Sequence, residues 1–255
     1  WKPSIWKEEP STIENGFSGM RITSCGGGGV LAVKGLLLAG GRGTRLRPTT
    51  YIYNKHLIMV YDKPMVLHAI ECLKASGITD IIISLSYHEP EHFIDFLEDG
   101  RELGVNLTYV IHGEPKGIAY GVYHAKHLIN GKFLVYLADN IFENNLANYV
   151  QRFESENNDA MVLFKHDENP QRYGVAKFDA DKLVSLIEKP ENPPSKYIVL
   201  GAYFFTPRFF EEYPKIKPSQ RGEYEMADVI NLLMPKVSYD IYTAEWFCLL
   251  YTSPS

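Results

Sequence analysis

Residues 34–48 read Lys34-Gly35-Leu36-Leu37-Leu38-Ala39-Gly40-Gly41-Arg42-Gly43-Thr44-Arg45-Leu46-Arg47-Pro48. An apolar run passes directly into a loop that holds three glycines and three arginines. Glycines lack a Cβ atom, so backbone N–H groups can come close to phosphate oxygens, while arginines supply permanent charge in a planar fork that suits phosphate. The segment therefore predicts a buried strand that ends in an anion-binding loop.

Two common phosphate-loop patterns do not match this segment. It lacks the GKS or GKT ending of a Walker A loop, and the spacing after Gly43 departs from GxGxxG. On composition alone, a glycine-rich turn with solvent-exposed arginines is the competing interpretation. The density of arginines favours a site for an anion such as a triphosphate.

From residue 33 onward, short apolar runs alternate with amphipathic stretches, and Gly, Pro, Asn or Asp residues mark the joins. This pattern predicts an α/β, Rossmann-like fold with a mostly parallel sheet flanked by helices, which binds ligands beyond the carboxyl ends of its strands. In the helix expected at 89–98, Phe93, Phe96 and Leu97 should bury one face. We expect strands at 34–38, 80–85, 107–111, 133–137 and 160–164, and helices at 64–76, 89–98, 117–128 and 146–155.

After Asn169-Pro170 the pattern becomes rich in strands. Residues 173–178 and 183–188 flank a turn at 179–182 and predict a hairpin, and residues 198–205 predict a buried strand. Helices are expected to begin at Thr206-Pro207 and to cover 223–234. This part is expected to form a small β-rich subdomain.

The two ends of the chain lack this pattern. We expect residues 1–32 to be an unstructured or foreign leader and residues 248–255 to be a truncated or artificial tail. Between them, residues 33–247 are expected to form the functional domain, in two parts that meet at about residue 165.

Bulk composition excludes several classes of function. A net charge of −5 argues against nucleic acid as a partner, because such binding needs a broad basic face. No apolar stretch approaches the length of a membrane span. The three cysteines, Cys25, Cys72 and Cys248, form no CxxC pair, so neither a disulfide framework nor a zinc site is indicated. A cytoplasmic protein is expected.

The glycine–arginine loop resembles the signature of glucose-1-phosphate thymidylyltransferases, of the sugar nucleotidyltransferase family. The resemblance covers about residues 34–247 and implies the nucleotide-diphospho-sugar transferase fold, with a nucleotide part at about 33–165 and a small β-rich sugar-binding subdomain at about 166–247. Further matching motifs follow in family order at Lys55, 61–65, 114–119, 139–142, 172–175, 188–190 and 222–225. The resemblance implies that the chain transfers a deoxythymidylyl group from dTTP to glucose 1-phosphate and releases pyrophosphate.

The resemblance also implies roles for individual residues. Arg45, Lys55 and Asp139 would be catalytic, through charge stabilisation of an in-line attack at the α-phosphorus. The nucleotide would be bound by Leu38, Gly40, Gly41, Gly43, Thr44, Arg45, His112 and Gly117. The sugar phosphate would be bound by Asn140, Tyr173, Gly174, Glu188, Lys189 and Val199.

Asp139 follows the apolar run 133–137, which places its carboxylate at the carboxyl end of a strand. The resemblance implies that it binds Mg²⁺, which takes one or two carboxylates together with phosphate oxygens and waters. Without the resemblance, Asp139 could equally be a helix N-cap, whereas a surface lysine is the favoured interpretation of Lys55 and a charged strand end that of Glu188-Lys189.

The chain departs from the family pattern at two positions that bear on function. His112 stands where the family has a glutamine that binds the base, which leaves the choice between dTTP and UTP open. Cys248 stands where the family has its second metal-binding aspartate, and the family's closing helices do not follow. The alternatives are therefore a UTP-using uridylyltransferase and a nucleotide-binding domain without turnover. The resemblance also implies a homo-oligomer as the assembly of complete relatives.

Overall fold

The computed structural model describes residues 33–41, 43, 46–48, 50 and 54–249. The expected leader at 1–32 and the tail beyond residue 249 lie outside this described part, as do Thr44 and Arg45 of the arginine loop. No helix in the described part combines the length and the apolar character that a membrane crossing requires.

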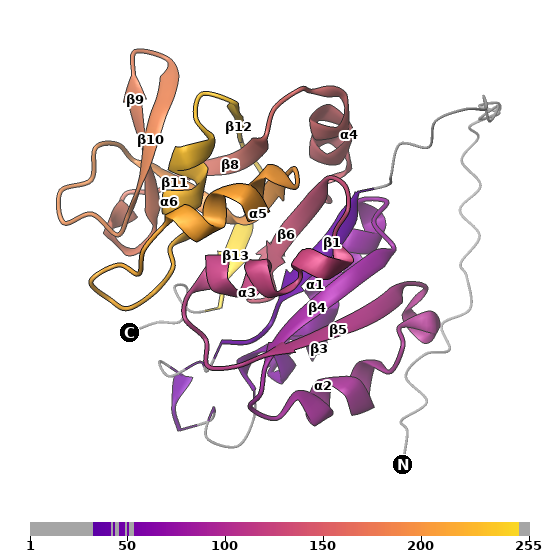
Figure 1. Cartoon of the computed structure of the whole chain (residues 1–255). Coiled ribbons are helices and arrows are strands. Elements are labelled where there is room, and N and C mark those ends of the chain that lie inside the picture. The colour runs from indigo at the N-terminus through magenta and orange to yellow at the C-terminus, as the bar shows by residue number, and fades with distance from the viewer. Residues whose placement is uncertain (1–32, 42, 44–45, 49, 51–53, 250–255) are drawn as a thin grey trace, which may run out of the picture. The chain divides into compact units, whose positions relative to one another are not determined.

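A nine-stranded sheet is the centre of the described chain (Figure 1). One arm of it runs β6-β1-β4-β5, and all three of these pairings are parallel. The other arm joins through β11 to β8 and β12 and to the hairpin β9-β10. The strands are β1 (Lys34–Leu38), β4 (Asp80–Ser86), β5 (Asn106–His112), β6 (Phe133–Leu137), β8 (Ala160–His166), β9 (Gly174–Asp179), β10 (Lys182–Glu188), β11 (Tyr197–Phe205) and β12 (Val237–Ile241).

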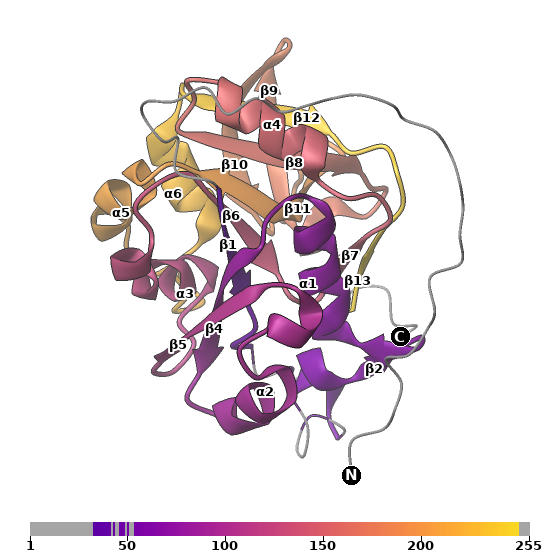
Figure 2. The same cartoon turned by 90° about the vertical axis from the view of Figure 1, so that its right-hand side faces the viewer.

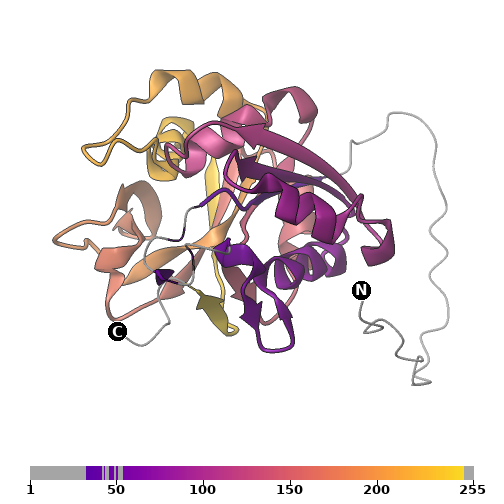
Figure 3. The same ribbon diagram turned by 90° about the horizontal axis from the view of Figure 1, so that it is seen from below.

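Chain order reverses at β1. The chain adds β4 and then β5 on one side of β1, and it returns with β6 on the other side. In open α/β sheets such a reversal leaves a crevice at the carboxyl ends of the two strands between which it occurs. Figure 3 looks onto this end of the molecule, where β1 leads into the glycine–arginine loop.

Helices cover both faces of the sheet (Figure 2). The alternation of side chains along β1 explains why, since Leu36 packs into one core and Leu37 into the other. The core around Leu37 includes residues from α1 (Met65–Ala75), α2 (Pro90–Leu97) and α4 (Ala147–Ser155). The core around Leu36 includes residues from α3 (Ile118–His124), α5 (Arg208–Glu212) and α6 (Met226–Leu233).

The long strand β11 connects the two parts of the fold. It is antiparallel to β6, β8 and β9, so these three neighbours all run in one direction and β11 runs in the other. On one edge, residues 202–205 pair with β6 while Ile198 pairs with β9. The sheet therefore forks beside Gly201, and the fork opens at the carboxyl end of β6.

Two small sheets complete the described structure. Strands β2 (Met59–Val60) and β3 (Lys63–Pro64) form a short hairpin before α1. Strands β7 (Asn140–Phe142) and β13 (Trp246–Cys248) pair antiparallel, with Cys248 opposite Asn140. This second pairing brings the end of the described chain back to the residue that follows Asp139.

Candidate active site

A cavity of about 420 Å³ lies at the crevice between β1 and β6. The carboxyl ends of the two strands are in register, because Leu38 pairs with Leu137 and the Ala138 N–H donates to the Leu38 carbonyl at 3.1 Å. Gly40 and Asp139, two residues beyond each strand, both line the cavity as a result.

Lys55 lies across the glycine loop. It begins the 3₁₀ helix η3 (Lys55–Leu57), and the side chain of Asn54 caps that helix by accepting the His56 N–H. A Cβ atom on Gly41 would lie 3.2 Å from Lys55 Cε, and one on Gly43, where φ is +58°, would lie 3.0 Å from Lys55 Cβ. The glycines are needed here because a bulkier loop would displace the lysine.

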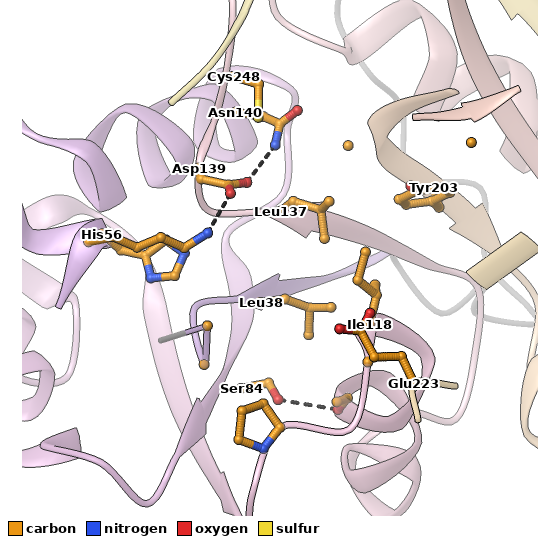
Figure 4. Close-up of a pocket in the computed structure, with 18 of the residues that line it drawn as sticks. Leu38, His56, Ser84, Ile118, Leu137, Asp139, Asn140, Tyr203, Glu223 and Cys248 are labelled. Carbon is orange, nitrogen blue, oxygen red and sulfur yellow. Dashed lines mark hydrogen bonds and ion pairs between the residues drawn. The ribbon is translucent and has the colours of Figure 1, made fainter. Parts of the chain in front are cut away.

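Lys55 and Asp139 form a buried ion pair with 2.5 Å between Nζ and Oδ2, and their side chains are 7% and 10% exposed. The other oxygen of Asp139 accepts the Asn140 side-chain amide at 2.7 Å (Figure 4). Burial alone would raise the pKa of Asp139, but the charge of Lys55 and the hydrogen bonds from Lys55 and Asn140 hold that pKa below its ordinary value. Asp139 is therefore ionised at neutral pH.

His56 stands beside this pair and also lines the cavity. Burial, followed by the charge of Lys55, lowers the pKa of its imidazole to about 3, so the ring is neutral. Its Nδ1 contacts the Asn54 side-chain oxygen at 2.8 Å, and that oxygen can only accept, so Nδ1 carries the hydrogen.

The opposite side of the cavity is formed by α3 and the end of β5. His112 Nδ1 donates to the Gly113 carbonyl at 3.0 Å, and burial lowers the pKa of the ring. A neutral ring with its hydrogen on Nδ1 presents Nε2 as an acceptor. Nε2 lies near Gly40, whose added Cβ would be 3.2 Å away, and within the described chain no hydrogen bond to Nε2 is found.

Gly117 fixes how α3 enters the site. Its φ is +104°, and an added Cβ would lie 2.5 Å from the Tyr224 carbonyl oxygen. The Tyr224 N–H donates to the Lys116 carbonyl at 2.7 Å, and the Ala119 N–H donates to the Tyr224 carbonyl at 3.3 Å. The loop before α6 is thus bound directly to the amino end of α3.

The hairpin β9-β10 supplies the remaining wall. Glu188 lines the cavity, and burial raises the pKa of its carboxyl group, against the opposing charge of Lys189. Its Oε1 is 3.5 Å from Lys189 Nζ and 3.3 Å from Arg221 Nη2. Arg221 also holds Glu225 at 2.8 Å, so it links the hairpin to the loop before α6.

The structure brings most of the predicted site residues to one cavity. Arg45 and Thr44 lie outside the described residues, and Lys189 pairs with Glu188 without lining the cavity. The roles predicted for the individual site residues stay predictions. The predicted residues that line it are Leu38, Gly40, Gly41, Gly43, Lys55, His112, Gly117, Asp139, Asn140, Tyr173, Gly174, Glu188 and Val199.

Sequence reasoning did not single out several other lining residues. His56 follows Lys55 and carries no signal of its own, whereas Arg172 and Glu223 stood within the motifs at 172–175 and 222–225, and Trp246 lies two residues before Cys248. Gly201 could have been found, because a glycine inside a buried apolar strand often marks a close approach of another group. An added Cβ at Gly201 would lie 2.5 Å from the Asn140 side chain.

Comparison with known proteins decides the family. The sequence profile described as Nucleotidyl transferase matches residues 34–247. The chain belongs to the nucleotidyl transferase family. A glucose-1-phosphate thymidylyltransferase of Mycolicibacterium smegmatis is 40% identical over 205 residues, which are 79% of this chain and 71% of that protein. One from Xanthomonas campestris is 39% identical over 199 residues, 77% of this chain and 68% of that protein.

Another nucleotidyltransferase, the low-salt glycan biosynthesis protein Agl11 of Haloferax volcanii, is 39% identical over 204 residues. The match covers 79% of this chain but 57% of that relative, so the chain spans little more than half its length. The predicted resemblance to glucose-1-phosphate thymidylyltransferases is confirmed by the relatives of that name.

Solved structures confirm the α/β fold. A Bacillus anthracis protein provisionally named a glucose-1-phosphate thymidylyltransferase, in complex with sucrose, has a TM-score of 0.81 at 35% identity. That alignment covers 87% of this chain and 91% of that one. A UDP-glucose pyrophosphorylase complexed with UDP-glucose has a TM-score of 0.76 at 21% identity, covers 86% and 94%, and shows the shared fold alone.

Proposed function

We propose that the chain transfers a deoxythymidylyl group from dTTP to glucose 1-phosphate, giving dTDP-glucose and pyrophosphate. The observation that carries this proposal is the buried Lys55–Asp139 pair, which lies beside the glycine loop in a cavity that also contains Glu188. The names of the relatives support the same reaction.

The reaction needs fixed charge more than it needs proton transfer. Attack on an α-phosphorus spreads negative charge over the equatorial and leaving oxygens, and preorganised cations stabilise that charge. Lys55 is held by Asp139 with its ammonium group beside Gly41. The sugar phosphate is an anion at neutral pH, so it can attack without a general base.

The base side of the cavity suits a base with an N3–H group. His112 presents the acceptor Nε2, and thymine and uracil both carry a donor at N3. The same geometry serves dTTP and UTP, so a UTP-using enzyme is the alternative in this respect. The relatives named glucose-1-phosphate thymidylyltransferase favour dTTP.

We further propose that Asp139 contributes to a Mg²⁺ site. Within the described residues, each of its oxygens accepts one hydrogen bond, from Lys55 or from Asn140, and each has a second lone pair. One carboxylate with substrate phosphates and waters is a usual Mg²⁺ environment, and Mg²⁺ when bound would neutralise phosphate charge. Among the described residues no group of three metal-binding side chains occurs, so the donor set fits a cation shared with the substrate.

A second candidate function is nucleotide binding without turnover. The observation that favours it is Cys248, which lies opposite Asn140 in the β7–β13 pair and lines the cavity. A thiol is a poor ligand for Mg²⁺ compared with the aspartate of the family pattern.

The first test is pyrophosphate release from the purified chain with glucose 1-phosphate, Mg²⁺ and either dTTP or UTP. Faster release with dTTP that is lost in Arg45→Ala and retained in Arg47→Ala supports the proposal. Arg47→Ala is the matched control, because it removes the same charge from the same loop. Faster release with UTP supports the uridylyltransferase. No release, together with a melting temperature raised by nucleotide, supports the binding domain.

A further inference from the structure

We propose that Trp246 is a positioning residue that orients Asp139 through the side chain of Asn140. The indole N–H of Trp246 donates to Asn140 Oδ1 at 2.8 Å. The Asn140 amide nitrogen in turn donates to Asp139 Oδ1 at 2.7 Å. This chain of contacts ends at Lys55, which holds Asp139 Oδ2 at 2.5 Å.

The direction of these hydrogen bonds follows from the chemistry of the indole. An indole N–H can only donate, so the oxygen of the Asn140 amide must face Trp246. The amide nitrogen then faces Asp139, which as a carboxylate can only accept. The reversed amide would place its oxygen against the carboxylate and its NH₂ group against the indole N–H, so Trp246 selects one of two orientations.

Packing leaves rotation of the amide as the main freedom of Asn140. The residue is 2% exposed, and its side chain lies against Gly201 so closely that an added Cβ there would be 2.5 Å away. Its carbonyl accepts the Tyr136 hydroxyl at 3.1 Å, and its strand pairs with β13 at Cys248. Asn140 therefore stays in place, and the hydrogen bond from Trp246 decides which way its amide points.

The consequence concerns the two oxygens of Asp139. With the amide oriented by Trp246, each oxygen has one donor among the described residues, and its second lone pair faces no other donor there. If the indole N–H is removed, the amide can reverse, and an oxygen then faces the charged carboxylate. The hydrogen bond from the Asn140 amide nitrogen to the charged Asp139 carboxylate would then be lost.

The test removes the N–H and keeps the ring. Since the kinetic part rests on the proposed function, its readout is pyrophosphate release. Trp246→Phe is expected to lower kcat roughly 10-fold with less than about a twofold change in the KM for nucleotide, as expected for one hydrogen bond to a charged group. Asn140→Leu should lower kcat similarly, and Trp246→Phe should have no further effect in that background. Independent losses that multiply would overturn the proposal.

A second measurement decides the question even without turnover. The chain has three tryptophans, so the ¹⁵N-labelled protein gives three indole N–H signals, and the one lost in Trp246→Phe is that of Trp246. This signal should shift in Asn140→Leu and stay in place in Tyr242→Phe. Tyr242 is the matched control, because its hydroxyl binds the Asn144 backbone beside the same strand outside the cavity. An unmoved indole signal in Asn140→Leu would refute the relay whether or not the chain is an enzyme.

Discussion

Replacement of Lys55 by methionine would remove the charge from the buried pair and keep most of the side-chain volume. Asp139 would then remain in a site where its side chain is 10% exposed, and among the described residues the Asn140 amide would be its side-chain donor. Loss of one partner from a buried ion pair costs about 3–5 kcal/mol. Because the pair lines a cavity that admits water, we expect the lower end, about 3 kcal/mol, or roughly 6–12 °C in melting temperature for a domain of this size.

The control is Lys63→Met. Lys63 pairs with Glu71 at 2.7 Å, but the two side chains are 27% and 51% exposed. Exposed pairs contribute less than about 1 kcal/mol, so this variant should lose less than about 4 °C. Melting temperatures by differential scanning calorimetry at pH 7, without ligand, make the comparison. Equal losses in the two variants would refute the reasoning.

The pH dependence of the same variant gives an independent check. In the wild type, the pKa of Asp139 is depressed, so its contribution to stability is present above the unfolded pKa and is lost as pH falls through the folded pKa. In Lys55→Met, burial raises the pKa instead, and protonation on acidification relieves the cost. The gap between wild type and variant should therefore narrow from pH 7 to about pH 4.5, and a gap that widens contradicts the assignment.

Three further predictions concern the rest of the cavity. Gly117→Ala should weaken nucleotide binding, measured by calorimetry, at least about tenfold. Gly77→Ala is the control and should leave binding unchanged, because φ is also positive there, at +84°, but an added Cβ would meet nothing within 4 Å. Equal affinities of the two variants would count against the Tyr224 contact. His112 is neutral because its pKa is lowered, so binding of dTTP should be constant near neutral pH and fall on acidification as Nε2 becomes a donor, an effect that must vanish in His112→Phe. Cys248→Asp should lower the Mg²⁺ concentration that gives half-maximal pyrophosphate release, and an unchanged requirement would show that this position does not reach the cation.

Local pattern predicts the sheet of this protein well. Strands β1 and β6 have the predicted bounds, because a continuous apolar run buried on both faces has clear ends at Gly or Asp. The helix expected at 117–128 is shorter, since α3 ends at His124 and a 3₁₀ turn follows. The prediction for Phe96 is wrong: it is 45% exposed, while Phe93 and Leu97 are 1% and 4% exposed. Phe93 and Leu97, which are four residues apart, form the buried stripe of this two-turn helix. Phe96 lies about 100° from Leu97 around the helix axis, so its side chain falls outside that stripe.

The site could be predicted only in part from residues alone. A glycine–arginine loop indicates an anion, but the pairing of Lys55 with Asp139 joins residues 84 positions apart, and local periodicity carries no information on it. The resemblance to a known family supplied both residues. The short strands β7 and β13 were missed because each has three residues and forms only when the other is near. Contacts such as Trp246 with Asn140 depend on that pairing and follow from the fold.

Strand β11 has a consequence for how substrates enter. It is bonded to β6 and β9 along one edge and to β8 along the other, so the nucleotide-facing and hairpin-facing walls of the cavity are built on the same backbone. The ladders leave a gap at residues 200–201, because β8 pairs with 197–199 and 203–205, β6 with 202–205 and β9 with Ile198. Any movement of the two walls toward a bound substrate would therefore bend the shared strand beside Gly201, and faster amide hydrogen exchange at residues 200–201 than in the paired parts of β11 would show this directly.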